Sequence, residues 1–182
     1  MNEPQTDQEA VLVTQVQAGD GAAFHLLLKQ NLPMIHQYAS RMLGNPTEAA
    51  DVAQDVFIRF WQKSQSFDPT RAKLSTWLHQ IAHNLCVDYF RKQARLTGLE
   101  DREEPTGALL ESDLDQEQRT QLMRTLISQL PERQRSALIL CHYQGFSNNQ
   151  AAKILDVTIE ALESLLSRAR RTLKSTLKEQ SL

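Results

Sequence analysis

The strongest constraint on this chain is a pair of short amphipathic helices near its C-terminus, separated by a tight turn. Ser147, with Gln150 three residues later, forms a capping box, which predicts that a helix begins at the next residue. Residues 155–158 are long enough only for a turn, and Thr158 can cap a second helix. In that second helix the apolar residues recur at three- and four-residue spacing and predict one buried stripe: Leu162, Leu165, Leu166, Ala169, Leu173 and Leu177. The segment therefore predicts a helix-turn-helix.

The opposite stripe of the second helix is polar at first and basic towards its end. It consists of Glu160, Ser164, Ser167, Arg171, Lys174 and Lys178. A helix-turn-helix can lay the early residues of its second helix against base edges while later cations hold phosphates. Helical bundles also contain such pairs, and a basic helix end complements the helix dipole. The capping box, the short turn and the cations of residues 168–171 together favour DNA binding.

The remainder of the 182 residues predicts further helices. Glycine and proline are scarce, at 6 each, and strand-like alternation is hard to find. We expect helices over 7–18, 22–43, 47–63, 74–95 and 116–129, with a bend at Pro33 and one more helix after Pro131. The expected fold class is all-α, with small helical domains at 1–96 and 116–182. A flexible acidic linker at 97–115 joins them, and the second domain holds the helix-turn-helix.

The net charge of −2 conceals a strong segregation of charge. Residues 71–95 contain five Lys or Arg and a single acid, Asp88, and residues 158–178 contain five against two acids. Between them, residues 97–115 hold seven acids against Arg102. This distribution, with two basic segments on either side of an acidic connector, indicates the kind of partner better than the net charge does.

Several classes of protein are disfavoured by the composition. No apolar run approaches the roughly 18 residues of a membrane span, and the N-terminus lacks the features of a signal peptide. Cys86 and Cys141 lie far apart, as expected for reduced thiols of a cytosolic protein. His79 and His83 have the spacing of a zinc protease motif, but Gln80 stands where that motif needs glutamate. We expect no metal, no cofactor and no catalysis.

Two polar helix faces are further candidates for binding. Asp51, Gln54 and Asp55 share a face that is either a solvated surface or a docking face for a basic partner. In the helix over 74–95, Trp77 precedes a row of amide, imidazole and charged groups: Gln80, His83, Asn84, Asp88, Arg91 and Arg95. This combination suits unpaired nucleic acid, although the place of Trp77 in the apolar stripe of the helix favours the core for Trp77 itself.

Taken in order, these segments resemble the extracytoplasmic-function (ECF) class of bacterial sigma factors. The resemblance to sigma domain two rests on Gly19-Asp20, Ala23-Phe24, Arg41 to Asn45, Asp51 to Phe57, Thr76-Trp77-Leu78, Ile81-Ala82 and Asn84 to Arg91. The resemblance to sigma domain four rests on Leu130 to Arg135, Gly145-Phe146-Ser147 and Leu166 to Arg170. Their order and separation around the acidic linker carry the resemblance.

The resemblance implies a dissociable, cytoplasmic subunit of RNA polymerase that is held by an anti-sigma factor. Core polymerase would be contacted by Asp51, Gln54, Asp55 and Phe57. The −10 promoter DNA, as a single strand, would be contacted by Trp77, Gln80, His83, Asn84, Asp88, Arg91 and Arg95, with the loop at 68–75 shaping a base pocket. The −35 duplex would be contacted by Thr158, Glu160, Ala161, Glu163, Ser164, Ser167, Arg168 and Arg171. The linker would thread through core polymerase.

Two departures from the family pattern affect the second domain. Glu163 stands where many relatives carry a basic residue, so it either accepts from a cytosine amino group or faces solvent. Asp156 replaces a frequent turn glycine, a position where Asp tolerates the left-handed conformation. Two other functions remain open, namely a dimeric helix-turn-helix regulator that works without polymerase and a helical adaptor that binds only protein.

Overall fold

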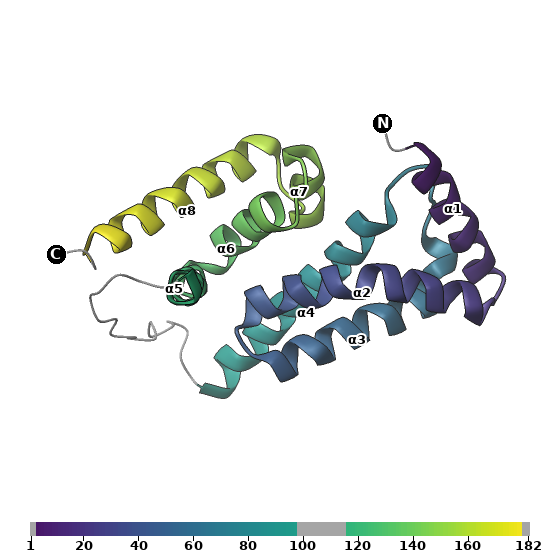
Figure 1. The fold of residues 1–182 in the computed structure, drawn as a ribbon, viewed down its shortest axis with the longest axis horizontal. Helices are drawn as coiled ribbons and strands as arrows, with labels where there is room; N and C mark the ends of the chain where they lie inside the picture. The colour runs from purple at the N-terminus through teal and green to yellow at the C-terminus, as the bar shows by residue number, and fades with distance from the viewer. Residues whose placement is uncertain (1–2, 98–115, 180–182) are drawn as a thin grey trace.

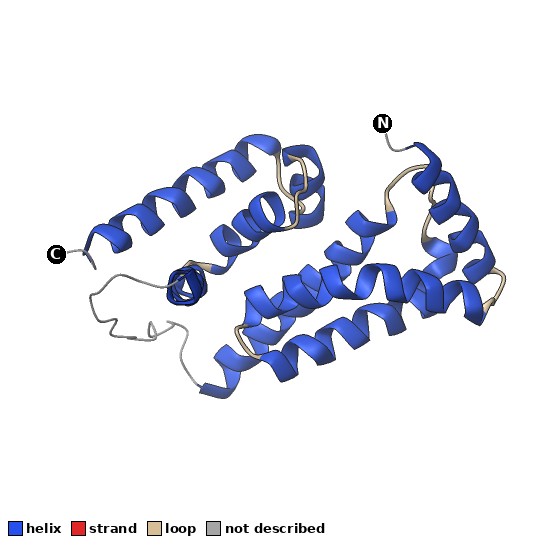
Figure 2. Cartoon of the chain, viewed as in Figure 1, coloured by secondary structure: helices blue, strands red, loops and turns tan. Residues whose placement is uncertain are grey.

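The computed structural model describes residues 3–97 and 116–179 as helices joined by short loops (Figures 1 and 2). In chain order these are α1 (Glu3–Gln17), α2 (Gly21–Leu43), α3 (Pro46–Lys63), η1 (Ser64–Ser66), α4 (Leu74–Thr97), α5 (Gln116–Gln129), α6 (Glu132–Leu138), η2 (Ile139–Tyr143), α7 (Asn148–Leu155) and α8 (Ile159–Glu179). Neither described segment contains a strand, and the expected all-α class is confirmed. Residues 98–115, which make up nearly all of the expected linker, lie outside the described residues.

Local capping explains where α2 begins and ends. The Asp20 carboxylate accepts hydrogen bonds from the backbone N–H groups of Ala22 and Ala23, at 2.8 and 3.1 Å, so α2 begins at Gly21. It ends at Leu43, because the next residue, Gly44, has a φ of 68°, which is readily adopted only without a Cβ atom. Pro33 lies inside α2, so the expected bend does not end the helix.

Helices α1 to α4 form the first domain around a core of aromatic and aliphatic side chains. The largest fully buried side chains of this core are Leu27, Ile35, Tyr38, Met42, Phe60, Leu74 and Leu78. The rings of Phe24 and Phe60 stack at a centroid distance of 5.9 Å, which joins α2 to α3. This packing holds the outer faces of α2, α3 and α4 in fixed relative positions.

Helices α5 to α8 form the second domain, which contains the predicted helix-turn-helix. The capping box of Ser147 and Gln150 is present, and Asp156 adopts the left-handed conformation with φ 52°. The predicted apolar stripe of α8 faces inward, with Leu162, Leu166 and Ala169 buried. The helix that follows Pro131 continues beyond α6 as a π-helix, η2, which the sequence pattern did not predict.

The two domains pack against each other along a boundary that we call the domain seam. Helix α7 lies against α4, and α2 packs against α5, α6 and η2 (Figure 1). The residues that meet here are Met42, His79 and Phe90 of the first domain and Arg135, Ser136 and Phe146 of the second. The ring centroids of His79 and Phe146 are 4.7 Å apart, edge to face. The seam joins residues far apart in sequence, and the sequence alone did not predict it.

Candidate nucleic-acid and protein interfaces

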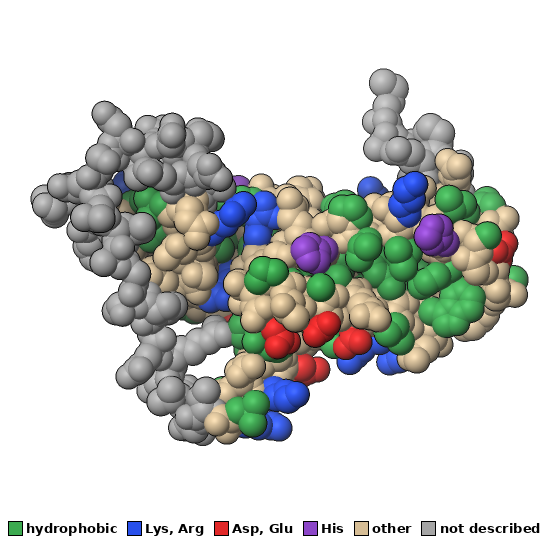
Figure 3. Space-filling model, turned by 60° about the horizontal axis from the view of Figure 1, so that its bottom comes forward, with side chains coloured by type: hydrophobic (Ala, Val, Ile, Leu, Met, Phe, Trp, Pro, Cys, Tyr) green, Lys and Arg blue, Asp and Glu red, His purple; other side chains and the backbone are tan. Residues whose placement is uncertain are grey.

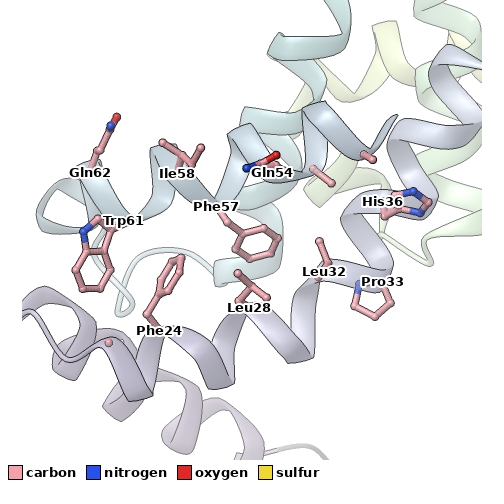
Figure 4. Close-up of a pocket in the computed structure, with 13 residues that line it drawn as sticks. Phe24, Leu28, Leu32, Pro33, His36, Gln54, Phe57, Ile58, Trp61 and Gln62 are labelled. Carbon is pink, nitrogen blue, oxygen red and sulfur yellow. The ribbon is translucent and has the colours of Figure 1, made fainter. Parts of the chain in front are cut away.

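An apolar groove of about 910 Å³ runs along the outer face of the first domain, between α2 and α3 (Figure 4). Its main apolar side chains are Phe24, Leu28, Leu32, Phe57, Ile58 and Trp61. Figure 4 shows the rings of Phe24, Phe57 and Trp61 directed into the space between the two helices. Phe57, a predicted partner contact, is only 3% exposed and therefore forms part of the groove wall.

Two large apolar side chains of the groove remain open to solvent. Ile58 is 44% exposed and Trp61 is 42% exposed. The Trp61 ring meets Phe24 edge-on, with the centroids 5.1 Å apart, which fixes its position without covering it. The spacing of Val52, Val56, Phe57, Phe60 and Trp61 would suggest one apolar face, but Trp61 lies at the open edge of it. Successive helix residues differ by about 100° in direction, so Trp61 cannot share the inward direction of its buried neighbour Phe60.

Acidic and amide groups lie beside this groove. Asp51 and Asp55, one turn apart on α3, are both exposed, and Gln54 between them lines the groove. Figure 3 shows acidic side chains gathered next to apolar ones on the face that carries α3. The combination suits a partner segment with apolar and basic side chains.

The polar row on α4 divides into two parts. Asn84, Asp88, Arg91 and Arg95 are exposed, and Arg91 forms an ion pair with Asp88 at 3.3 Å. Gln80 is half-buried at the edge of this face. These residues present amide, acidic and basic groups to solvent on one helix face.

Trp77 and His83 differ from the rest of the row. The half-buried Trp77 packs its ring against Phe67 and Phe60, at centroid distances of 5.1 and 5.9 Å, so it belongs to the edge of the core. His83 lies about 100° around the helix from Asn84 and turns towards Tyr38, whose hydroxyl is 3.1 Å from its Nδ1. Burial, with the charge of Arg133 nearby, lowers the pKa of His83 to about 4.

The loop before α4 is ordered by one carboxylate. Asp68 accepts hydrogen bonds from both the backbone N–H and the hydroxyl of Thr70, at 2.9 and 2.7 Å. These bonds favour the charged form and lower the pKa of Asp68. The resulting turn fixes how the chain enters α4.

The predicted face of the helix-turn-helix is presented to solvent along most of α8. Thr158 accepts a hydrogen bond from the Ala161 backbone N–H at 3.2 Å and so caps α8 as expected. All the residues predicted to contact the −35 duplex are exposed: Thr158, Glu160, Ala161, Glu163, Ser164, Ser167, Arg168 and Arg171. Arg170 takes another direction, with its Nη2 3.1 Å from Nε2 of His142.

Comparison with known proteins explains why these surfaces occur in one chain. The family model for sigma-70 region 2 matches residues 27–96, and the model for sigma-70 region 4 matches residues 120–173. The chain is 31% identical over 179 residues to the ECF RNA polymerase sigma factor SigW of Bacillus subtilis, covering 92% of this chain and 95% of that protein. The chain belongs to the ECF family of RNA polymerase sigma factors. This sigma factor is also 33% identical to the ECF RNA polymerase sigma-E factor of Escherichia coli, with 95% of each chain covered.

Solved structures of similar proteins agree with this family. CnrH, determined in complex with the cytosolic domain of CnrY, matches this sigma factor with a TM-score of 0.72 at 25% identity, covering 94% of this chain and 97% of that one. The sigma factor RpoE of Bartonella quintana, determined with the anti-sigma factor NepR, matches with a TM-score of 0.68 at 29% identity, over 85% and 96% of the two chains. The two matched regions of this sigma factor contain all of the predicted contact residues.

The histidine pair of this sigma factor is engaged within the protein. His79 is 1% exposed, and its Nδ1 lies 2.7 Å from the carbonyl oxygen of Ser75. Within the described residues, no cluster of three or more His, Cys, Asp or Glu could hold a metal ion. None of the helices in those segments is long and apolar enough to cross a membrane.

Proposed function

We propose that this sigma factor binds core RNA polymerase, directs it to a specific set of promoters, and leaves catalysis to the polymerase. The observation that carries the proposal is the presence of both sigma regions in one chain, each with an exposed polar face at the positions predicted to contact DNA. A dimeric helix-turn-helix regulator that works without polymerase would need neither sigma-70 region 2 nor the groove between α2 and α3.

Core polymerase docks, in this proposal, on the groove and its acidic edge. Trp61 and Ile58 supply exposed apolar area, and Asp51 with Asp55 supplies the opposite charge for a basic segment. Apolar contact with the groove would give most of the affinity, while the carboxylates favour the correct encounter and orientation. Phe57 supports the groove from within.

Promoter opening depends on the exposed face of α4. Separating base pairs costs about 1.4 kcal/mol per step in lost stacking and pairing. Capture of an unpaired base by stacking and hydrogen bonding returns roughly 1–3 kcal/mol. The exposed amide of Asn84 can hydrogen-bond to a base edge, and the guanidinium groups of Arg91 and Arg95 can contact phosphates. His83, turned into the protein in this structure, contributes only if the surrounding packing opens.

The helix-turn-helix reads the −35 duplex through the early residues of α8. Ser164 and Glu163 face solvent where base edges would lie, and Arg168 with Arg171 follows at the phosphates. Control by an anti-sigma factor, and action in the cytoplasm together with polymerase, complete the proposal. The similarity to RpoE, whose structure was determined with an anti-sigma factor, supports the first of these.

Transcription in vitro with purified core polymerase tests the proposal. Promoter-specific RNA that appears only when this chain is added supports it, whereas sequence-specific DNA binding by a dimer without polymerase supports the alternative regulator. Replacing Asp51 and Asp55 by Lys should reduce transcription and core binding together. The control also adds two lysines, at His25 and Gln30, two exposed α2 residues that do not line the groove. Equal losses in both double variants would remove the proposed docking surface.

A further inference from the structure

A second cavity lies at the domain seam, away from both DNA-facing surfaces. It has a volume of about 960 Å³ and is bounded by the C-terminal half of α2, by α5 and by Tyr143 of η2. Among the residues whose side chains the structure describes, its lining contains two arginines, Arg41 from the first domain and Arg124 from the second, and no Asp or Glu. We call it the seam cleft.

No described side chain supplies a counter-charge to the two arginines of the seam cleft. Within the described segments neither Arg41 nor Arg124 takes part in an ion pair. The Arg41 guanidinium stacks on the ring of Tyr143, 4.5 Å from its centroid, and its Nη1 is shielded from solvent without a hydrogen-bond partner. A buried charged donor without a partner is destabilising, because it has lost its hydration without gaining a hydrogen bond. Burial, and to a smaller extent repulsion from Arg124, lowers the pKa of Arg41.

Two hydroxyl groups of the cleft already donate their protons to backbone carbonyls, so only their oxygen lone pairs remain for other contacts. The hydroxyl of Ser128 donates to the Thr125 carbonyl at 2.7 Å, and the hydroxyl of Thr125 donates to the Gln121 carbonyl at 3.1 Å. Both hydroxyl protons are therefore directed to the backbone of α5. The recognition chemistry of the cleft is set by its guanidinium groups.

We propose that the seam cleft binds the phosphate group of a small phosphorylated molecule. Two guanidinium groups match the double negative charge and several oxygens of a phosphate better than those of a single carboxylate. Arg41, held against Tyr143, lines one wall of the cleft, and Arg124 lines the wall formed by α5. The cleft is larger than a phosphate ion, and Met123 and Ile127 provide apolar wall for the rest of the molecule.

Binding at this position couples to the arrangement of the domains. Arg41 belongs to α2 and Arg124 to α5, so one phosphate can contact both arginines only while the two domains are in contact at the seam. A ligand that binds one arrangement alone shifts the population towards it. The ligand therefore opposes separation of the domains. Only the consequence for transcription rests on the proposed function, because the site itself does not depend on it.

Calorimetric titration of the full chain with inorganic phosphate, pyrophosphate, ATP without magnesium, and succinate tests the site. We expect saturable binding of at least one phosphate compound, weakened roughly tenfold to a hundredfold in Arg41→Gln and in Arg124→Gln. Arg124→Gln is the safer variant for folding because Arg124 is exposed. Lys29→Gln, which removes a charge from the exposed surface of α2 outside the cleft, should bind as the wild type does. The three phosphate probes distinguish the free ion from a larger metabolite.

Two results would overturn the site: no binding of any phosphate compound, or equal binding by the wild type and both arginine variants. Binding of succinate alone would overturn the assignment of phosphate. A bound ligand should also raise the thermal midpoint of the wild type but not that of Arg124→Gln. If the ligand binds as expected while the chain supports no transcription with core polymerase, the proposed function fails and the site stands.

Discussion

The guanidinium Nη1 of Arg135 donates a hydrogen bond of 2.6 Å to the carbonyl oxygen of Met42, across the domain seam. The same guanidinium donates through Nη2 to the carbonyls of Leu130, at 3.0 Å, and Ser128. One buried side chain thus satisfies carbonyls at the C-terminal ends of α2 and α5, which belong to different domains. The seam is held by a directional contact as well as by apolar packing.

Replacing Arg135 by Met should destabilise the protein strongly. The side chain is 5% exposed, and its loss leaves several buried carbonyl groups without their donor. We expect the free energy of unfolding in urea to fall by about 2–4 kcal/mol. Arg133→Met, at an exposed position two residues away, should change it by no more than about 0.5 kcal/mol. Similar losses for the two variants would contradict the role assigned to Arg135.

His83 should make stability depend on acidity. Its pKa of about 4 in the folded protein lies below the ordinary value of 6.5, so the unfolded chain takes up the proton first as the pH falls. Neutral His83 makes its full contribution to the free energy of unfolding above pH 6.5. That contribution is lost as the pH falls towards 4, to a maximum of roughly 3 kcal/mol. Arg133 and the Tyr38 hydroxyl are the groups that act on His83, and the pKa of nearby His79 is lowered in the same direction.

Urea unfolding of the wild type and of His83→Gln, measured between pH 7.5 and 4.5, isolates this effect. The glutamine amide can still reach the Tyr38 hydroxyl but does not titrate. The difference in unfolding free energy between the two proteins should therefore change with pH. A constant difference across the range would show that His83 is not protonated preferentially on unfolding.

Trp61→Ala should separate partner binding from stability. Because 42% of the side chain is exposed, truncation should destabilise the fold only modestly, whereas a central aromatic residue in an interface contributes about 2 kcal/mol or more to affinity. We expect the affinity for core polymerase to fall by roughly 30-fold. Val11→Ala, at an exposed apolar position on α1 outside the groove, is the control. Unchanged core affinity in Trp61→Ala would exclude this part of the groove.

Asn84→Ala should slow promoter opening more than it weakens the initial complex. The exposed amide is proposed to contact a base only after the strands separate, so it cannot favour the closed complex. Opening can be followed by fluorescence of a base analogue in the −10 element, and closed-complex affinity by binding at low temperature. Equal opening rates for the wild type and the variant would remove Asn84 from this role.

Arg171→Ala should weaken binding to duplex DNA broadly rather than at one base. A lost phosphate contact lowers the slope of log affinity against log salt by roughly 1. The comparison is Arg170→Ala, because Arg170 is the neighbouring cation but lies against His142. Reduced affinity for one sequence only, with an unchanged salt slope, would mean that Arg171 reads a base.

Short-range features of the sequence predicted most of the local structure. The capping box at Ser147, the left-handed Asp156 and the stripe through Leu162 all occur as expected, because each depends on residues within one or two helical turns. The π-helix at Ile139–Tyr143 was missed because an extra residue in one turn leaves no clear apolar periodicity.

Long-range features were much harder to predict. The row on α4 from Gln80 to Arg95 was read as one surface, but His83 is directed into a contact with Tyr38 of α2. The carbonyl of Met42 gives no sign in the sequence that Arg135 will reach it from 93 residues away. The groove was missed for a related reason, since whether Trp61 is covered depends on how α2 crosses α3.

The closed seam has a consequence for the length of DNA that can lie between two recognition elements. While the domains are in contact, the exposed faces of α4 and α8 keep a fixed separation and rotation about the molecule. Each base pair inserted between two elements turns one relative to the other by roughly 34° and moves it by about 3.4 Å. Two faces held rigidly could bind both elements at only one spacer length. Under the proposed function, the range of spacer lengths that still support binding therefore measures how readily the hydrogen bond between Arg135 and Met42 breaks.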